Sequence, residues 1–182
     1  MPTPISPYSV ASPEELERNI PKLMASGAVD QLIMPVLFGS SDKKLLVVGH
    51  LEAGKLKLPD TFLHARPNCK LQDITDQVHQ LAHFAFGGSG SSLSPRFTGI
   101  IRHKAEQRVV IAPVLVRLDE RSSDQRLSPT DKWLECTPNN PDQVWMDRSA
   151  IYEILDGPNS DLLTSNTAFI IRCAAGPILG IE

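Results

Sequence analysis

The sequence predicts one α/β domain, with helices packed on a β-sheet. Two apolar segments at 31–38 and 44–50, separated by a polar turn, are typical of paired strands. An amphipathic segment at 71–86 is typical of a helix. The chain has 182 residues, of which 41% are hydrophobic and 21% charged, which is enough for one hydrophobic core. We therefore expect a single domain at 13–182, after a short arm.

Composition and charge exclude several classes of function. The formal net charge of -3 provides no broad positive field, so we expect no nucleic-acid partner. We expect no membrane partner, because no apolar run approaches the ~20 residues that span a bilayer. The proline-rich N-terminus has no signal-peptide pattern, which favours a cytoplasmic protein. Cys69, Cys136 and Cys173 are widely spaced, so we expect reduced thiols without a structural zinc site.

The N-terminal region should contain an arm followed by a helix. Prolines at four of the first thirteen positions make 1–12 an extended arm, because proline lacks a backbone N–H and has a fixed φ. Ser12-Pro13-Glu14-Glu15 is a helix start, in which serine caps, proline occupies the first turn and the acids complement the helix dipole. This helix is expected at 13–26.

A hairpin should follow. Residues 31–38 and 44–50 are its two strands, and Pro35 suggests an edge position or a bulge in the first of them. A short segment, GKLKLPD, occupies 54–60, and an irregular loop is expected from there to Cys69.

The clearest helix in the sequence is 71–86, which is followed by Gly87-Gly88, a common helix stop. Residues 87–94 are then a loop whose glycines do not have phosphate-binding spacing. The apolar residues of the helix recur at three- and four-residue steps, and they are Leu71, Ile74, Val78, Leu81, Ala82 and Ala85.

Two further strands are expected at 97–103 and 108–118, separated by a charged turn at 104–107. If side chains alternate along the first of them, Arg96 and Arg102 lie on one sheet face. The remaining predictions are a polar loop at 119–131, a strand at 133–136, a turn at 137–142, a helix from Asp147 to Leu155 and a last helix or strand at 164–175.

This order of elements resembles the Nudix hydrolase family over about 31–155. Residues 33–50, IMPVLFGSSDKKLLVVGH, are similar to the family's opening hairpin, and GKLKLPD stands where the family has a tryptophan-leucine-proline-glycine-glycine segment. The resemblance implies an α/β/α sandwich with a mixed central sheet. It also places the family's catalytic helix at 71–86.

The glutamates on which the family's hydrolysis depends are missing from that helix. The family pattern is Arg-Glu-aliphatic-x-Glu-Glu-x-Gly, and aligning it puts His79 at the arginine, Gln80 at the first glutamate, and His83 and Phe84 at the glutamate pair. Mg²⁺ usually needs carboxylate oxygens, which these side chains lack. We therefore expect no metal and no cofactor. The helix at 71–86 carries a degenerate form of the family's catalytic motif, the Nudix box.

The remaining polar side of the helix suggests acid–base chemistry instead. On a helical wheel Gln72, Asp76, His79 and His83 lie on one flank. A carboxylate beside an imidazole fixes its tautomer, and two imidazoles can exchange protons with a substrate. His79, His83 and Asp76 are thus the catalytic candidates. The alternative is structural, because histidines beside an apolar stripe are commonly solvated or bonded to a nearby carbonyl.

Other readings of the same region are weaker. His79 and His83 have the spacing of the zincin motif, but Gln80 replaces the glutamate that activates water. Cys69 is a further candidate nucleophile. The residues that we expect to bind the substrate are Gln80, Phe84, Arg96, Arg102 and His64. The aromatic side chain of Phe84 favours an apolar ligand.

The sequence thus favours a Nudix-like enzyme that isomerises, cyclises or rearranges a small, largely apolar metabolite without a metal, with a homodimer allowed. One alternative is a non-catalytic ligand sensor or protein-interaction module with the same fold. A second is a residual hydrolase of a nucleoside-diphosphate-type substrate, with carboxylates from outside the helix such as Glu52, Asp60 or Glu135.

Overall fold

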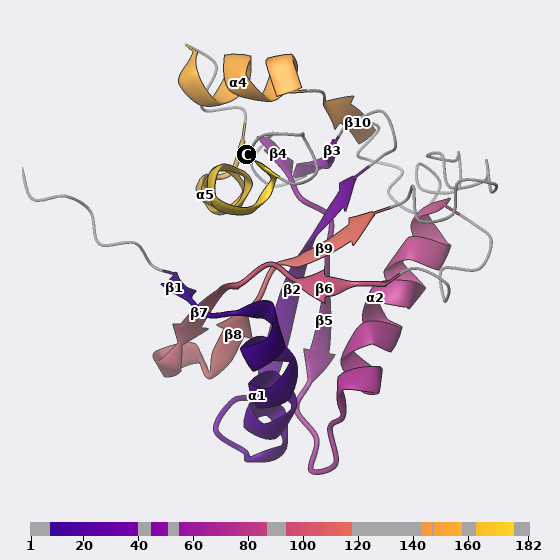
Figure 1. Ribbon diagram of the computed structural model, residues 1–182, viewed down its shortest axis with the longest axis vertical. Helices are drawn as coiled ribbons and strands as arrows, with labels where there is room; N and C mark the ends of the chain where they lie inside the picture. Colours follow the sequence, from indigo (N-terminus) through magenta and orange to yellow (C-terminus); the bar gives the residue numbers. More distant parts are fainter. Residues whose placement is uncertain are drawn as a thin grey trace, which may run out of the picture.

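Strand β2 (Gln31–Gly39) is the centre of the sheet (Figure 1). It pairs antiparallel with β5 (Asp60–His64) and parallel with both β8 (Val109–Ile111) and β9 (Val114–Arg117), so the sheet is mixed. The α/β class predicted from the sequence is confirmed. The computed structural model describes residues 8–39, 45–50, 55–86, 94–117, 143–146, 148–157 and 163–176.

The other strands extend the sheet on both sides of β2, and all ten strands within the described ranges belong to it. On one side, β1 (Ser9–Val10) pairs with β7 (Ile100–Lys104), and β7 pairs with β8 after the short helix η2 (Ala105–Gln107). On the other side, β3 (Leu45–His50) follows β2 and pairs with β4 (Lys55–Lys57) and β10 (Gln143–Met146). Strand β6 (Arg96–Phe97) pairs with β9.

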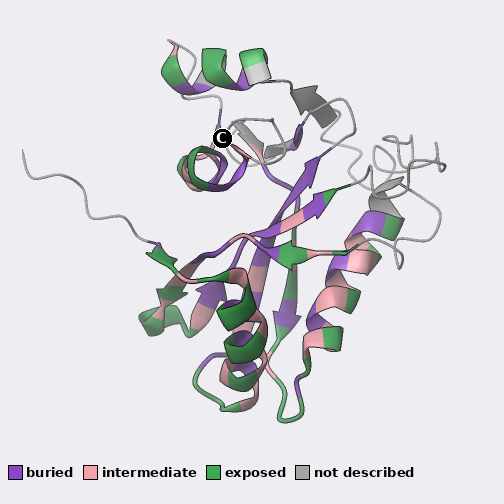
Figure 2. Ribbon diagram, viewed as in Figure 1, coloured by how far each residue is buried: buried purple, intermediate pink, exposed green. Residues whose placement is uncertain are grey.

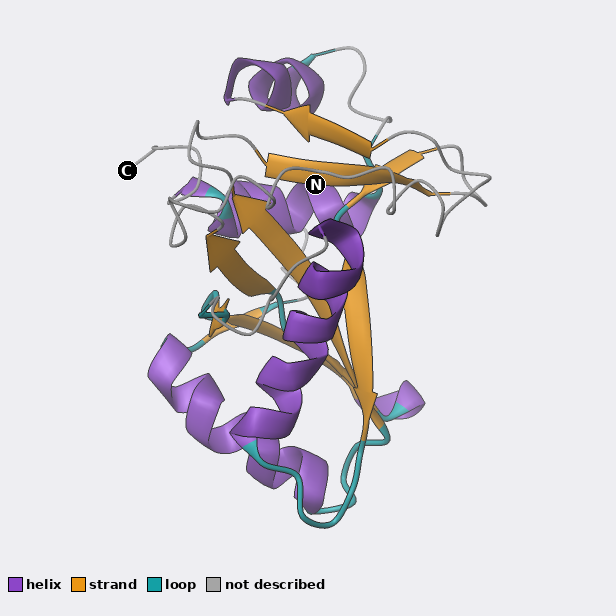
Figure 3. Cartoon of the chain, turned by 90° about the vertical axis from the view of Figure 1, so that its right-hand side faces the viewer, coloured by secondary structure: helices purple, strands orange, loops and turns teal. Residues whose placement is uncertain are grey.

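Helices cover both faces of this sheet. Side chains alternate along β2, so that Met34 and Phe38 join a core with α1 (Pro13–Ala25) and α2 (Leu71–Phe86). Leu37, on the opposite face, joins a second core with α4 (Arg148–Asp156) and α5 (Ser165–Ala174). Figure 2 shows the buried residues along the strands and on the inner sides of the helices, and Figure 3 shows the same layers from the side.

The predicted helices are found close to their expected bounds. Ser12 caps α1 by accepting a hydrogen bond from Glu15 N–H at 3.1 Å, with Pro13 in the first turn. Helix α2 covers 71–86, as its apolar periodicity predicts. Residues 165–174 form a helix rather than a strand, capped by Thr164.

Several strands differ from the sequence predictions. The irregular loop expected between 60 and Cys69 begins with β5, whose short alternating pattern does not stand out from its polar surroundings. Strand β10 was also missed, and it lies within a polar region. The strand expected at 97–103 is interrupted at Thr98-Gly99, where Gly99 has a φ of +99°. The predictions for 87–93, 119–131, 133–136 and 137–142, and Asp147 itself, lie outside the described residues.

Pro35 does not mark an edge strand, which corrects the sequence prediction. It lies within β2, where the parallel neighbour changes from β8 to β9. Ile33 pairs with Ile111 and Val36 with Val114, so the register continues and Pro35 falls opposite Pro113. Because neither proline has an N–H, the hydrogen-bond ladder is interrupted at this point.

Within the described part of the chain, no helix is both long and apolar enough to cross a membrane.

Candidate functional site

Helix α2 presents its polar side outward because its apolar side is tightly packed. Ile74, Val78 and Ala82 are each only 1% exposed, in the core that α2 shares with α1 and the sheet. Successive residues rotate by about 100° around a helix, so the remaining positions fall on two flanks with different neighbours.

The first flank carries a short polar chain. The side-chain amide of Gln72 donates a hydrogen bond to Asp76 Oδ1 at 2.6 Å, and the same oxygen lies 3.9 Å from Nδ1 of His79. The His79 side chain is only 17% exposed, so its ring is largely covered by its surroundings. His83 follows one turn later and is exposed. The predicted neighbourhood of Asp76 and His79 is therefore present, at a contact distance longer than a hydrogen bond.

The second flank faces β5. Asp73 forms an ion pair with Arg66 at 3.6 Å, and Gln77 lines a groove together with His64. The groove has a volume of about 420 Å³, which lies in the range of small-molecule sites. Gln80 is exposed and lies between the two flanks, three residues after Gln77 and four after Asp76. The structure thus separates His64 from His79 on α2.

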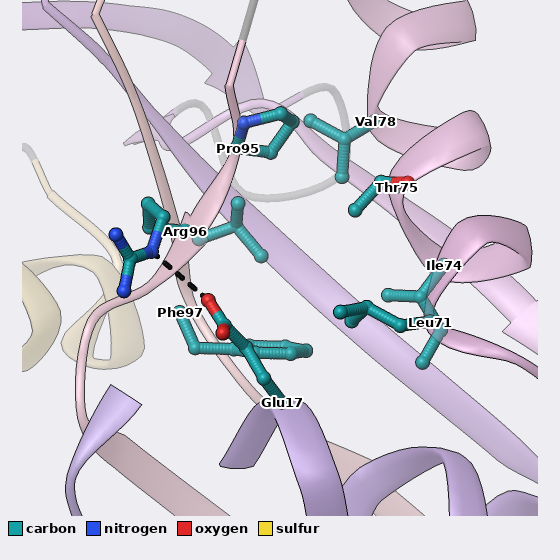
Figure 4. Close-up of a pocket in the computed structure, with 9 residues that line it drawn as sticks. Glu17, Leu71, Ile74, Thr75, Val78, Pro95, Arg96 and Phe97 are labelled. Atoms are coloured by element: carbon teal, nitrogen blue, oxygen red, sulfur yellow. Dashed lines mark hydrogen bonds and ion pairs between the residues drawn. The ribbon is translucent and has the colours of Figure 1, made fainter. Parts of the chain in front are cut away.

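A small cavity lies beside the first flank, between α2, α1 and β6. Arg96 and Thr75 line it from opposite sides (Figure 4). Arg96 forms ion pairs with Glu17 at 2.9 Å and with Glu14 at 3.4 Å. The cavity volume is about 30 Å³, enough for one or two water molecules and too small for an organic metabolite. Arg96 therefore links β6 to α1, and the described part of the site gives it no ligand-sized space.

The registers of β6 and β7 agree with the predicted alternation, because Arg96 pairs with Leu115 and Arg102 with Ile111, and both partners pack on the α5 side of the sheet. The two guanidinium groups have different neighbours, since Arg96 reaches Glu14 and Glu17 of α1. Arg102 lies away from these ion pairs. It shares the side of Ile100, which is in the core with α5, and it acts electrostatically on Tyr8. Burial raises the pKa of Tyr8, and the Arg102 charge opposes this rise. The Tyr8 ring stacks on Phe169 of α5 at 5.0 Å between centroids.

Cys69 has the features of a structural thiol. Burial, and next the nearby negative charge of Asp73, raise its pKa, so little thiolate is present at neutral pH. Among the described residues, no three histidine, cysteine or acidic side chains are grouped as metal ligands are. Asp60, one acid of the hydrolase alternative, lies 3.5 Å from Lys57. The side chain of Phe84, and Glu52 and Glu135, lie outside the described residues.

Phe62 and Gln77 line the groove with His64, and neither residue is predicted from the sequence as a site residue. The only signal was the alternation in Asp60–His64, where Leu63 is buried and its neighbours Phe62 and His64 are exposed. A five-residue strand with a charged first residue is hard to distinguish from a loop, and its pairing with β2 is what identifies it.

Comparisons with known proteins were made for the whole chain. No family model and no curated protein matches it. Solved structures do match, and one of them is the crystal structure of DR0079 from Deinococcus radiodurans. It is 11% identical, covers 78% of this chain and 81% of its own, and has a TM-score of 0.47. This similarity lies in the backbone arrangement, and it assigns neither a family nor an activity.

Proposed function

We propose that the chain is a divergent Nudix-like enzyme that catalyses metal-independent proton transfer on a small, largely apolar organic metabolite. The reaction would be an isomerisation, a cyclisation or a rearrangement rather than a metal-dependent hydrolysis. The observation that carries this proposal is the Gln72, Asp76 and His79 arrangement on one flank of α2. A cytoplasmic location and a small-molecule substrate belong to the same proposal.

The chemistry follows from the positions of these groups. Asp76 accepts the hydrogen bond of Gln72 and orients the Nδ1 side of His79, so Nε2 becomes the atom that removes a proton from the substrate. His83, one turn later, is placed to return a proton at another carbon. The proton count is then balanced and no co-reactant is needed. Asp76 is a positioning residue in this scheme.

Helix α2 suits such a role because it is rigidly held. Its buried stripe packs against β5 and α1, which limits the movement of the polar groups that it carries. A general base gains most when its geometry is fixed before the substrate binds. The partial burial of His79 also reduces competition from bulk water.

The test is deuterium exchange. The protein is incubated in D₂O with the small-molecule fraction of a cell extract, and mass spectrometry follows deuterium uptake at carbon and the appearance of isomers. We expect protein-dependent exchange that His79→Ala reduces by about 10²-fold or more, within the usual range for an acid–base group. The matched control is His103→Ala, an exposed histidine on β7, which should leave the exchange unchanged.

Equal exchange in wild type, His79→Ala and His83→Ala would contradict the proposal. EDTA separates the enzyme from the residual hydrolase: the histidine-based reaction should continue, whereas a metal-dependent hydrolysis should stop. The thermal midpoint of each variant should stay within a few degrees of wild type, because neither imidazole belongs to the fully buried core of the described residues.

A second candidate is a non-catalytic ligand sensor, and one observation favours it. The ligand-sized groove within the described residues lies on the β5 flank of α2, away from Asp76 and His79. A protein that binds a ligand there without any deuterium exchange would support the sensor and exclude the enzyme.

A further inference from the structure

The groove beside β5 is lined by two aromatic rings, those of Phe62 and His64, which is unusual for a protein surface. Phe62 is 52% exposed, although a phenylalanine ring at a sheet position is normally covered. Phe62 and His64 are two residues apart on the strand and therefore point to the same face. Their rings meet edge to face, with centroids 5.3 Å apart and planes at 76°. This arrangement offers ring surface against which a planar ligand can stack.

The guanidinium of Arg66 lines the same groove, two residues after His64. Arg66 is 50% exposed, and Asp73 of α2 holds it at 3.6 Å. The backbone around it is tied on both sides, by the hydrogen bond from Ala65 N–H to Asp30 O at 2.9 Å and by that from Cys69 N–H to Arg66 O at 3.2 Å. A guanidinium has five N–H donors, and a single carboxylate does not accept hydrogen bonds from all of them. The remaining donors are arranged so that they can bind both oxygens of a second carboxylate.

Gln77 of α2 also lines the groove and adds an amide that can donate to an anion. The volume of about 420 Å³ fits a ligand with one or two fused rings. The strand that carries the aromatic pair is paired with β2 along its length, so the groove exists before a ligand binds. Preformed sites lose less entropy on binding.

We propose that this groove binds a planar aromatic carboxylate, with the ring against Phe62 and His64 and the carboxylate at Arg66 and Gln77. The site is separate from the Asp76 and His79 flank, and it does not depend on the acid–base function. Ring contact favours an aromatic ligand over an aliphatic one, and the guanidinium favours a carboxylate over a neutral alcohol.

Isothermal titration calorimetry with 2-naphthoate tests this site on the full chain. We expect a Kd of about 1 mM or below, from the usual affinity per atom for a ligand of this size. Phe62→Ser and Arg66→Gln should each weaken binding by about fivefold to tenfold, in line with one aromatic contact and one charged contact. Circular dichroism confirms that each variant is folded.

Matched controls come from the far side of the molecule. Tyr152→Ser removes an aromatic side chain that is 41% exposed on α4, and Arg172→Gln removes an ion-paired arginine that is 51% exposed on α5. Both should leave the Kd unchanged, as should His79→Ala. Retained affinity in Phe62→Ser and Arg66→Gln, or an equal loss in the controls, overturns the proposal.

Two other ligands test whether binding requires both the aromatic rings and the carboxylate. 2-Naphthalenemethanol keeps the rings without the charge, and cyclohexanecarboxylate keeps the charge without the rings. Each should bind at least about fivefold more weakly than 2-naphthoate. Equal binding of either one, or no heat with 2-naphthoate at 5 mM, about five times the expected Kd, shows that the groove does not select aromatic carboxylates.

Discussion

The hydroxyl of Thr167, on α5, accepts a hydrogen bond from the backbone N–H of Leu58 at 3.1 Å, although the two residues are 109 positions apart. Both residues are buried, and Thr167 is the buried polar residue of the described chain. Leu58 lies between β4 and β5, and the next carbonyl, of Pro59, accepts a hydrogen bond from Val36 N–H at 2.7 Å. One side chain therefore joins α5 to the segment that leads into the groove.

Replacing Thr167 with Val should lower the free energy of unfolding by about 1–3 kcal/mol, because Leu58 N–H is then buried without an acceptor. Thr167→Ser keeps the hydroxyl and should cost less than about 1 kcal/mol, the value of one methyl group. Urea denaturation measures both variants. A larger loss in Thr167→Ser than in Thr167→Val would mean that packing of the methyl, rather than the hydrogen bond, is what matters here.

Gly99→Ala should destabilise the protein by about 1–3 kcal/mol, the usual cost of a strained backbone position. Gly99 has a φ of +99°, and a Cβ there would lie 2.9 Å from Ala11 O, the backbone next to the start of α1. Gly27→Ala is the matched control, because Gly27 also has a positive φ, of +81°, but nothing lies within 4 Å of its Cβ position. Thermal unfolding should show the larger loss for Gly99→Ala, and the reverse order would contradict the contact with Ala11.

Alkylation of Cys69 should be slow at neutral pH and should rise with pH beyond the range of an ordinary thiol. Burial and the Asp73 charge both raise its pKa, so the thiolate appears only at higher pH. Asp73→Asn removes the negative charge and releases Arg66, and both changes lower the pKa and speed the reaction. Peptide mapping after iodoacetamide treatment measures this rate. An unchanged rate in Asp73→Asn would leave burial as the sole cause.

Asp76→Asn should change the tautomer of His79 without unfolding α2. In the proposed arrangement the carboxylate favours the proton on Nδ1 and leaves Nε2 as the base. Nitrogen-15 NMR of the imidazole at pH 8 distinguishes the two tautomers. Gln72→Ala, which removes only the hydrogen bond to Asp76, should have a smaller effect. Identical spectra in wild type and Asp76→Asn would rule out an orienting role for this carboxylate.

Local signals predicted much of the helical framework. The cap at Ser12 with Pro13 marks the start of α1, and the apolar repeat between Leu71 and Phe86 marks α2, because both depend on neighbours within one or two turns. The pairing of β2 needs contacts with segments about 30 and 78 positions away, as its register with β5 and β8 shows. Such long-range contacts are not evident in the local sequence of a strand as short as β5.

The sequence by itself determined that the helix at 71–86 keeps a buried stripe and carries histidine, amide and phenylalanine where the Nudix pattern has carboxylates. Only the tertiary structure decided which neighbours meet its polar side. The helical wheel orders residues around one axis, whereas the sheet and α1 decide what each flank faces. Contacts with β5 therefore bring Gln77 to the groove that His64 also lines, and the position of α1 pairs Arg96 with Glu14 and Glu17, whereas Arg102 lies near Tyr8.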